Sequence, residues 1–215
     1  MLRNMLVSAF LLAAFAVAAA SLVGLTHLGT RERVEANERQ ALVETLHALV
    51  PAERHDNDLL DTRTQVIDPL LGSKRPVPIY RALQGGETVA VILAPVAPDG
   101  YSGDIHLLVA VEADGSLAGV RVTAHRETPG LGDLVEAERS DWITHFTGLS
   151  LGNPPEARWK VRKDGGDFDQ FTGATITPRA VVKAVANTLR YVEAHRAELF
   201  APEAQRAAVL QETAQ

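Results

Sequence analysis

The chain of 215 residues contains no cysteine. This absence excludes disulfides, thiolate nucleophiles, cysteine-ligated iron–sulfur clusters and the Cys-x-x-Cys-His attachment of haem. A block of lysine and arginine is also missing, and the formal net charge is −6, so the sequence offers no basic surface for nucleic acid. If the protein transfers electrons, it needs an organic cofactor or a metal bound by histidine and carboxylate.

Several enzyme motifs are missing as well. The sequence has no His-Glu-x-x-His pair and no Gly-x-Ser-x-Gly elbow, and its Gly-Ser-Lys at 72–74 lacks the upstream glycine of a phosphate-binding loop. The seven histidines are scattered, which is typical of surface or packing residues rather than metal ligands. We therefore predict no metal site.

A long hydrophobic run is present only at the N-terminus, where residues 5–26 carry no charge. A helix of this length spans about 33 Å, close to the hydrocarbon thickness of a bilayer. Ala-x-Ala sequences at 16–18 and 18–20 leave a cleaved signal peptide as the alternative. Because the apolar run continues past those sites, we favour a retained transmembrane helix over residues 5–27, preceded by a short N-terminus (1–4).

Charges beside the membrane segment do not fix its orientation. Arg3 lies on one side, and Arg31 and Arg33 lie on the other side, where nearby glutamates offset their charge. Residues 28–51 are predicted to form a stalk helix that packs on the following domain and stops at Pro51. The apolar positions of this helix are Val34, Leu42, Leu46 and Leu49.

The next part of the chain, residues 52–200, is expected to form one domain, followed by a polar tail (201–215). Its strand candidates are not separated by long helices, so they are predicted to pair antiparallel. Pro78 marks the first long strand as an edge, and Asp114-Gly115 predicts a hairpin turn. The expected strands are 64–67, 77–83, 87–95, 104–112, 117–124 and 159–162, and the expected helices are 134–138, one from about 140, and 178–200.

The fold class is therefore α+β, with an N-terminal transmembrane helix before an antiparallel sheet flanked by helices.

Three threonines and a glycine crowd the start of the last helix, in residues 172–177. Pro178 suits the first helical position, which makes Thr177 the expected N-cap. Such a helix start favours a phosphate, and Arg179 and Lys183 would add positive charge. A plain capped helix after a tight turn explains the same residues without a ligand.

This segment resembles the flavinylation motif of flavin-carrying subunits in Rnf-type and Na⁺-translocating quinone reductase complexes. In that motif an Asp is followed three residues later by Thr or Ser and then Gly-Ala-Thr, which Asp169 and residues 172–175 match, although Gln170 replaces the usual glycine. The resemblance implies that Thr175 carries FMN through a phosphoester bond, with Thr177 and then Thr172 as alternative acceptors. The neighbours expected to contact the cofactor are Thr172, Gly173, Ala174 and Thr177.

Two further segments carry the same resemblance: Glu-Thr-Pro-Gly-Leu-Gly at 127–132 and Gly-Tyr-Ser-Gly at 100–103. A Pro-Gly turn exposes backbone N–H groups that a flavin edge can use, Leu131 would lie against the ring face, and Tyr101 would stack nearby. The alternatives are a structural turn and a plain loop before a strand. The expected cofactor contacts from these segments are Tyr101, Glu127, Thr128, Gly130 and Leu131.

The order of these segments is similar to that in G subunits of Rnf-type (Rsx-type) electron transport complexes, with C subunits of the Na⁺-translocating NADH:quinone reductase as the close alternative. The resemblance implies an electron carrier at the bacterial inner membrane, with its N-terminus cytoplasmic and its domain periplasmic. The complex would couple electron transfer between ferredoxin and NAD to ion movement. The implied partners are membrane and Fe–S subunits, one with a second covalent FMN, and a flavin transferase.

Alone, such a chain is expected to turn over no substrate. Two other functions stay open from the sequence. One is a membrane-tethered sensor or assembly module without a cofactor, and the other is a stand-alone periplasmic reductase with an FMN domain.

Overall fold

The structure is a computed structural model that describes residues 1–202. The chain divides into two compact units, residues 1–44 and a larger unit that begins at Thr45. Nearly all of the predicted polar tail (201–215) lies outside the described residues.

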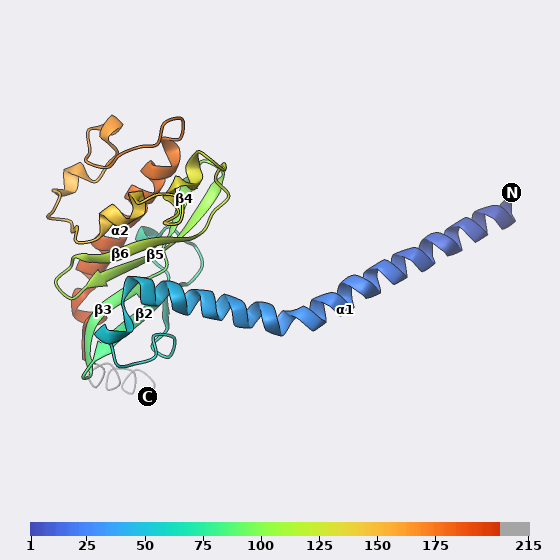
Figure 1. Ribbon diagram of the computed structural model, residues 1–215, viewed down its shortest axis with the longest axis horizontal. Coiled ribbons are helices and arrows are strands. Elements are labelled where there is room, and N and C mark those ends of the chain that lie inside the picture. Colours follow the sequence, from blue (N-terminus) through green and yellow to red (C-terminus); the bar gives the residue numbers. More distant parts are fainter. Residues whose placement is uncertain (203–215) are drawn as a thin grey trace. The chain divides into compact units, whose positions relative to one another are not determined.

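Helix α1 (Leu2–Leu49) runs without interruption through the first unit and ends just inside the second (Figure 1). Residues 1–41 are all exposed, including large apolar side chains such as Phe10 and Phe15. The helix is long and apolar enough to cross a membrane, and a helix with exposed apolar side chains all round suits lipid as its surroundings. No break in α1 marks the predicted boundary between an anchor (5–27) and a stalk (28–51), so that boundary stays a prediction.

The domain is built on an antiparallel sheet, as predicted. β2 (Val77–Gln84) pairs with β3 (Glu87–Leu93), and β3 pairs with the C-terminal half of β5 (Gly103–Glu112). β4 (Val96–Gly100) follows β3 and pairs with the N-terminal half of β5, while β6 (Leu117–Ala124) pairs along the opposite edge of β5. The hairpin turn between β5 and β6 contains Gly115 with a φ of +91°, as its Asp-Gly sequence predicts.

Two expectations about strands were wrong, and β4 was missed. β2 is not an edge, because the short β1 (Thr64–Val66) pairs with it. β4 escaped notice because it contains Pro98, which an edge strand tolerates since its N–H is not needed for pairing there. The strand expected at 159–162 is a short bridge between Val161 and Phe168.

Helix α2 (Ile176–Ala194) lies along one face of the sheet (Figure 1) and packs on β4, β5 and a 3₁₀ turn, and α3 (Arg196–Leu199) follows it. The main core lies between α2 and this face, where β5 contributes the alternating side chains Ile105, Leu107, Val109 and Val111. The opposite face of the sheet buries Leu46, Leu49 and Val50, which belong to the same unit. The remaining short helices are 3₁₀ turns: η1 (Ala52–Arg54), η2 (Pro69–Leu71), η3 (Gly132–Val135), η4 (Trp142–Phe146), η5 (Glu156–Arg158) and η6 (Arg162–Asp164).

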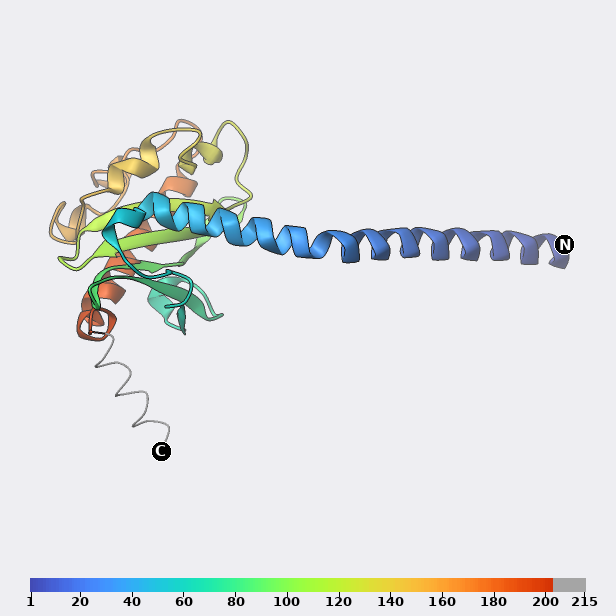
Figure 2. The same cartoon turned by 60° about the horizontal axis from the view of Figure 1, so that its bottom comes forward.

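The irregular segment between β6 and α2, yellow to orange in Figure 2, lies beside β6, which η4 contacts. It is held by a cluster of aromatic rings whose centroids lie 4.9–6.1 Å apart. The Trp142 indole N–H also donates to the Asp169 carbonyl at 2.9 Å. This packing fixes the turn that leads into α2. The rings are those of Trp142, Phe146, Trp159, Phe168 and Phe171.

Candidate functional site

A cavity of about 490 Å³ opens where three segments of the domain meet: the turn between β4 and β5, the loop 127–132 and the entry to α2. Three apolar side chains at the cavity, Tyr101, Leu131 and Ile176, remain 68%, 42% and 43% exposed. Such half-exposed apolar walls suit a flat aromatic ligand that keeps one edge in water. The lining residues are Tyr101, Glu127, Thr128, Leu131, Gly132, Gly173, Ala174, Thr175, Ile176 and Thr177.

The entry to α2 is a tight turn. Phe171 is buried in the aromatic cluster, and its carbonyl accepts the Ala174 N–H at 3.1 Å. Gly173 has a φ of +83°, a conformation that favours glycine at the third position of such a turn. Thr172 lies at the exposed corner of the turn, and Thr175 directly precedes the first helical residue.

The prediction that Thr177 caps α2 was wrong. The helix begins at Ile176, so Thr175 occupies the N-cap position, where its side chain makes no capping hydrogen bond. Pro178 is the third helical residue instead of the first. It fits there because the N–H groups of the first turn have no partner within the helix, so the missing proline N–H costs nothing.

Thr177 has a different structural role. Its side chain is buried, and its hydroxyl donates a short hydrogen bond to Oε2 of Glu127. Oε1 of the same carboxylate accepts the Ser102 backbone N–H at 2.8 Å. Glu127 itself is only 5% exposed, so a buried carboxylate joins all three segments around the cavity.

Close approach of these segments requires glycine at position 132. A Cβ built on Gly132 would lie 2.8 Å from the Glu127 Cβ and 2.9 Å from the Thr177 hydroxyl oxygen. The loop 127–132 is itself closed by hydrogen bonds from the N–H groups of Leu131 and Gly132 to the Thr128 carbonyl. Gly130 lies at the outer tip of that turn and is exposed.

The positive charge expected from Arg179 and Lys183 does not face the cavity. Arg179 pairs with Asp164 at 2.6 Å, and Lys183 pairs with Asp99 at 2.5 Å. The hydrogen bond from Arg179 lowers the pKa of the Asp164 carboxyl. Both cations line a separate groove beside α2.

Most residues predicted to contact a cofactor come together at the cavity. The exceptions are Thr172 and Gly130, which do not line it. Sequence reasoning missed Gly132, Ile176 and the Ser102 N–H. Gly132 belongs to the Gly-Leu-Gly sequence and could have been included on that ground, whereas Ile176 was missed because the helix was expected to begin two residues later.

Comparison with known proteins agrees with this arrangement. A family model described as an FMN-binding domain matches residues 100–190, which include every residue that lines the cavity. A second model, the RnfG N-terminal region, matches residues 1–49, the extent of α1.

Curated relatives match the chain over most of its length. The G subunit of the ion-translocating oxidoreductase complex of Pseudomonas aeruginosa is 51% identical, with 94% of each chain covered. The proteins of the same name from Shewanella baltica and Vibrio vulnificus are 45% and 46% identical, with 93% and 88% of this chain and 95% and 90% of theirs covered. The cavity therefore belongs to an FMN-binding domain, and the chain is a member of the family of G subunits of Rnf-type ion-translocating oxidoreductase complexes.

Proposed function

We propose that the protein is a membrane-anchored electron carrier of an Rnf-type complex, with FMN attached to Thr175 by a phosphoester bond. The proposal is supported mainly by how the three threonine hydroxyls at the entry to α2 differ in burial, hydrogen bonding and position relative to the cavity. The Thr177 hydroxyl is buried and bonded to Glu127, and Thr172 lies away from the cavity. Thr175 lines the cavity, and its hydroxyl makes no hydrogen bond to any of residues 1–202, so it is free to form an ester.

The position of Thr175 also suits a phosphate. It immediately precedes a helix of 19 residues, whose first N–H groups and positive dipole end attract an anion. Ile176 and Thr177 supply such N–H groups next to the ester. Gly173 and Ala174 are small, which leaves room for the phosphate and the ribityl chain beside the backbone.

The remaining lining fits the ring of FMN. Leu131 and Ile176 offer apolar surface, Tyr101 offers an aromatic face, and the loop 127–132 adds backbone polar groups at the cavity edge. FMN supplies the redox chemistry, because it can accept and release electrons one or two at a time. The protein's part is to fix the ring in place and to leave an edge accessible to partner subunits.

Covalent attachment is suited to a domain on the periplasmic side, which we propose together with a cytoplasmic N-terminus. A flavin lost outside the cytoplasm would not be replaced from the cytoplasmic pool, whereas an ester retains it. The anchor α1 keeps the flavin near the membrane surface and raises its effective concentration near other membrane and Fe–S subunits. A separate flavin transferase would load Thr175, and electrons would pass through the complex between ferredoxin and NAD.

The test is mass mapping of the full chain after co-expression with a flavin transferase. Trypsin cleaves after Lys163 and Arg179, so one peptide holds Thr172, Thr175 and Thr177, and fragmentation locates the modification among them. We expect an FMN-sized mass on Thr175. Thr175→Ala should be colourless, whereas Thr175→Ser and Thr172→Ala should keep a yellow band after denaturation.

Flavin that stays attached in Thr175→Ala would overturn the assignment of the acceptor. A colourless wild-type protein after loading would instead favour a sensor or assembly module without a cofactor. Turnover of a small soluble acceptor by the isolated protein would favour a stand-alone reductase.

A further inference from the structure

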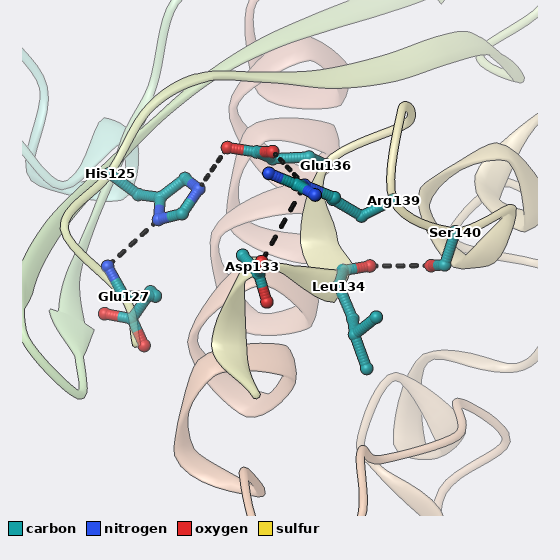
Figure 3. A network of polar contacts seen from close by, with 7 residues as sticks. All are labelled: His125, Glu127, Asp133, Leu134, Glu136, Arg139 and Ser140. Carbon is teal, nitrogen blue, oxygen red and sulfur yellow. Dashed lines mark hydrogen bonds and ion pairs between the residues drawn. The ribbon is translucent and has the colours of Figure 1, made fainter. Parts of the chain in front are cut away.

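We propose that His125 is a positioning residue for the flavin site, acting through its Nδ1 atom on the backbone of Glu127. The inference rests on the proposed function, since it assumes that flavin occupies the cavity beside Glu127. His125 directly follows β6, and its side chain is only 9% exposed. Figure 3 shows its ring between the Glu127 backbone N–H and the carboxylate of Glu136.

The two hydrogen bonds define the protonation of the ring. The Glu127 N–H lies 3.0 Å from Nδ1, and because a backbone amide can only donate, Nδ1 must be an acceptor without a proton. The ring proton is then on Nε2, which lies 2.7 Å from Oε1 of Glu136 and donates to it. A carboxylate partner on one ring nitrogen selects the tautomer and so determines what the other nitrogen can bind.

Glu136 is itself held in place. Its backbone N–H donates to the Asp133 carbonyl at 2.9 Å, and its Oε2 lies 3.5 Å from the Arg139 guanidinium, which also approaches Asp133. Ser140 closes the segment by donating its hydroxyl to the Leu134 carbonyl at 2.7 Å, as Figure 3 shows. The bond between His125 and Glu136 therefore joins the two ends of the loop 127–132 across its base.

The hydrogen bonds of His125 matter because Glu127 is fixed both at its backbone and at its carboxylate. Its backbone is held by Nδ1 of His125, and its carboxylate holds the Ser102 N–H and the Thr177 hydroxyl. A shift of the Glu127 backbone would move all three walls of the cavity together. His125 thus sets the geometry of the flavin site without lining the cavity.

The test separates the two ring nitrogens by matched substitutions in the full chain. His125→Asn places an amide oxygen at the position of Nδ1 and removes the group at Nε2. His125→Gln places an amide nitrogen at the position of Nε2 and removes the acceptor at Nδ1. His145→Gln is the control, because the His145 side chain is exposed and only approaches the Asp141 carboxylate, at 3.6 Å.

The first readout is amide hydrogen exchange at Glu127, measured in protein without flavin. We expect exchange about fivefold faster in His125→Gln, the change that corresponds to one hydrogen bond of about 1 kcal/mol, and near wild type in His125→Asn and His145→Gln. The second readout is the midpoint potential of the loaded protein, which should shift in His125→Gln and return toward wild type in His125→Asn. The third is the side-chain ¹⁵N spectrum of the wild type, which should show a proton on Nε2 and none on Nδ1.

Equal behaviour of the Asn and Gln variants would overturn the proposal, because it would mean that the ring only fills space or contributes nothing. Rescue by Gln but not by Asn would also overturn it and assign the role to Nε2. If neither variant folds, a proton on Nδ1 in the wild-type spectrum overturns it and a bare Nδ1 supports it. The exchange and spectral readouts need no flavin, so their failure is distinct from absence of flavin on Thr175.

Discussion

Two hollows beside α2, a basic groove along its side and the cavity at its start, differ in the charge of the side chains that line them. The groove along the side of the helix, of about 440 Å³, is lined by four cations, yet Arg179, Lys183 and Arg190 are paired with Asp164, Asp99 and Glu156. The cavity at the start of the helix has no lysine or arginine among its lining residues in the described part of the chain. Among the described residues that line it, only Glu127 carries a charge, and its carboxylate is buried and hydrogen-bonded.

The comparison shows that a cation close to a motif in sequence need not lie close to it in space. Arg179 is one turn beyond Thr175, but it extends along the helix side toward η6. A phosphate on Thr175 would therefore depend on backbone N–H groups and the helix dipole, which do not appear as charges in a sequence. Flavin binding is therefore expected to depend on the cavity, whose described lining holds no lysine or arginine, and not on the basic groove lined by Lys160, Arg179, Lys183 and Arg190.

The largest expected effect comes from Glu127→Ala. It leaves the buried Thr177 hydroxyl without its partner, which costs about 1–3 kcal/mol, and it removes the acceptor of the N–H of Ser102, an exposed residue whose N–H can bond to water instead. We expect a loss of about 3 kcal/mol in the free energy of unfolding and a strong reduction in flavin loading. Chemical denaturation and visible absorbance measure the two effects.

Glu127→Gln is the matched control, because its amide oxygen can still accept the Ser102 N–H while its amide nitrogen can donate to Thr177. It should lose much less stability than the alanine variant. If the alanine variant is as stable as wild type, the carboxylate does not hold the three segments together.

Gly132→Ala is expected to have the next largest effect. The new methyl group would lie within 3.0 Å of Glu127 and Thr177 atoms, so the loop 127–132 must move away from α2. Such overpacking costs about 1–3 kcal/mol. Thermal unfolding should show the loss, and Gly152→Ala, where a Cβ would meet only the Ser150 hydroxyl at 4.0 Å, should not. A wild-type melting temperature in Gly132→Ala would contradict the close approach.

Much of this architecture could be predicted from the sequence. The alternation of Ile105, Leu107, Val109 and Val111 predicted the correct strand and face, and the uncharged N-terminal run predicted α1. β4 was missed, since it contains Pro98, and although the short strand β1 was expected at 64–67, its pairing along the edge of β2 was not. Local patterns report periodicity, whereas edge pairing depends on tertiary context.

The site was predicted less completely, for a related reason. The sequence identified the three segments that meet at the cavity, but not which hydroxyl at the helix start would be engaged. Thr177 satisfies the rules for a cap as well as Thr175 does, and only the position of Glu127, 50 residues earlier in the chain, separates their roles. The hydrogen bonds of His125 with Glu127 and Glu136 were missed too, because they depend on how the loop folds.

Thr177→Val and Thr175→Ala should distinguish the structural roles of the two hydroxyls by their different effects on the free energy of unfolding. The valine keeps the volume of the threonine but removes the donor to Glu127, and a hydrogen bond to a charged group contributes about 2 kcal/mol. Thr175→Ala should leave the free energy of unfolding nearly unchanged in protein without flavin, because the Thr175 side chain makes no capping bond. Urea denaturation of both variants measures the difference, and a larger loss in Thr175→Ala would show that the helix start is held differently.

The smallest effect is expected in the basic groove, from Arg179→Ala. Flavin loading should be unchanged, because Arg179 faces Asp164 and not the cavity. Its effect should appear only in the pH dependence of stability. The pKa of Asp164 is lowered in the folded protein, mainly by the hydrogen bond from Arg179, so its contribution is present above the unfolded pKa of about 3.9 and is lost as the pH falls through the folded value.

The difference in melting temperature between wild type and Arg179→Ala should therefore be small at pH 7 and should shrink further below pH of about 4. Asp164→Asn removes the titrating carboxyl and should abolish this pH dependence, so adding Arg179→Ala to it should change nothing further. A loss of flavin in Arg179→Ala would reverse the comparison between the two hollows, because it would mean that this cation reaches the phosphate despite its pairing with Asp164.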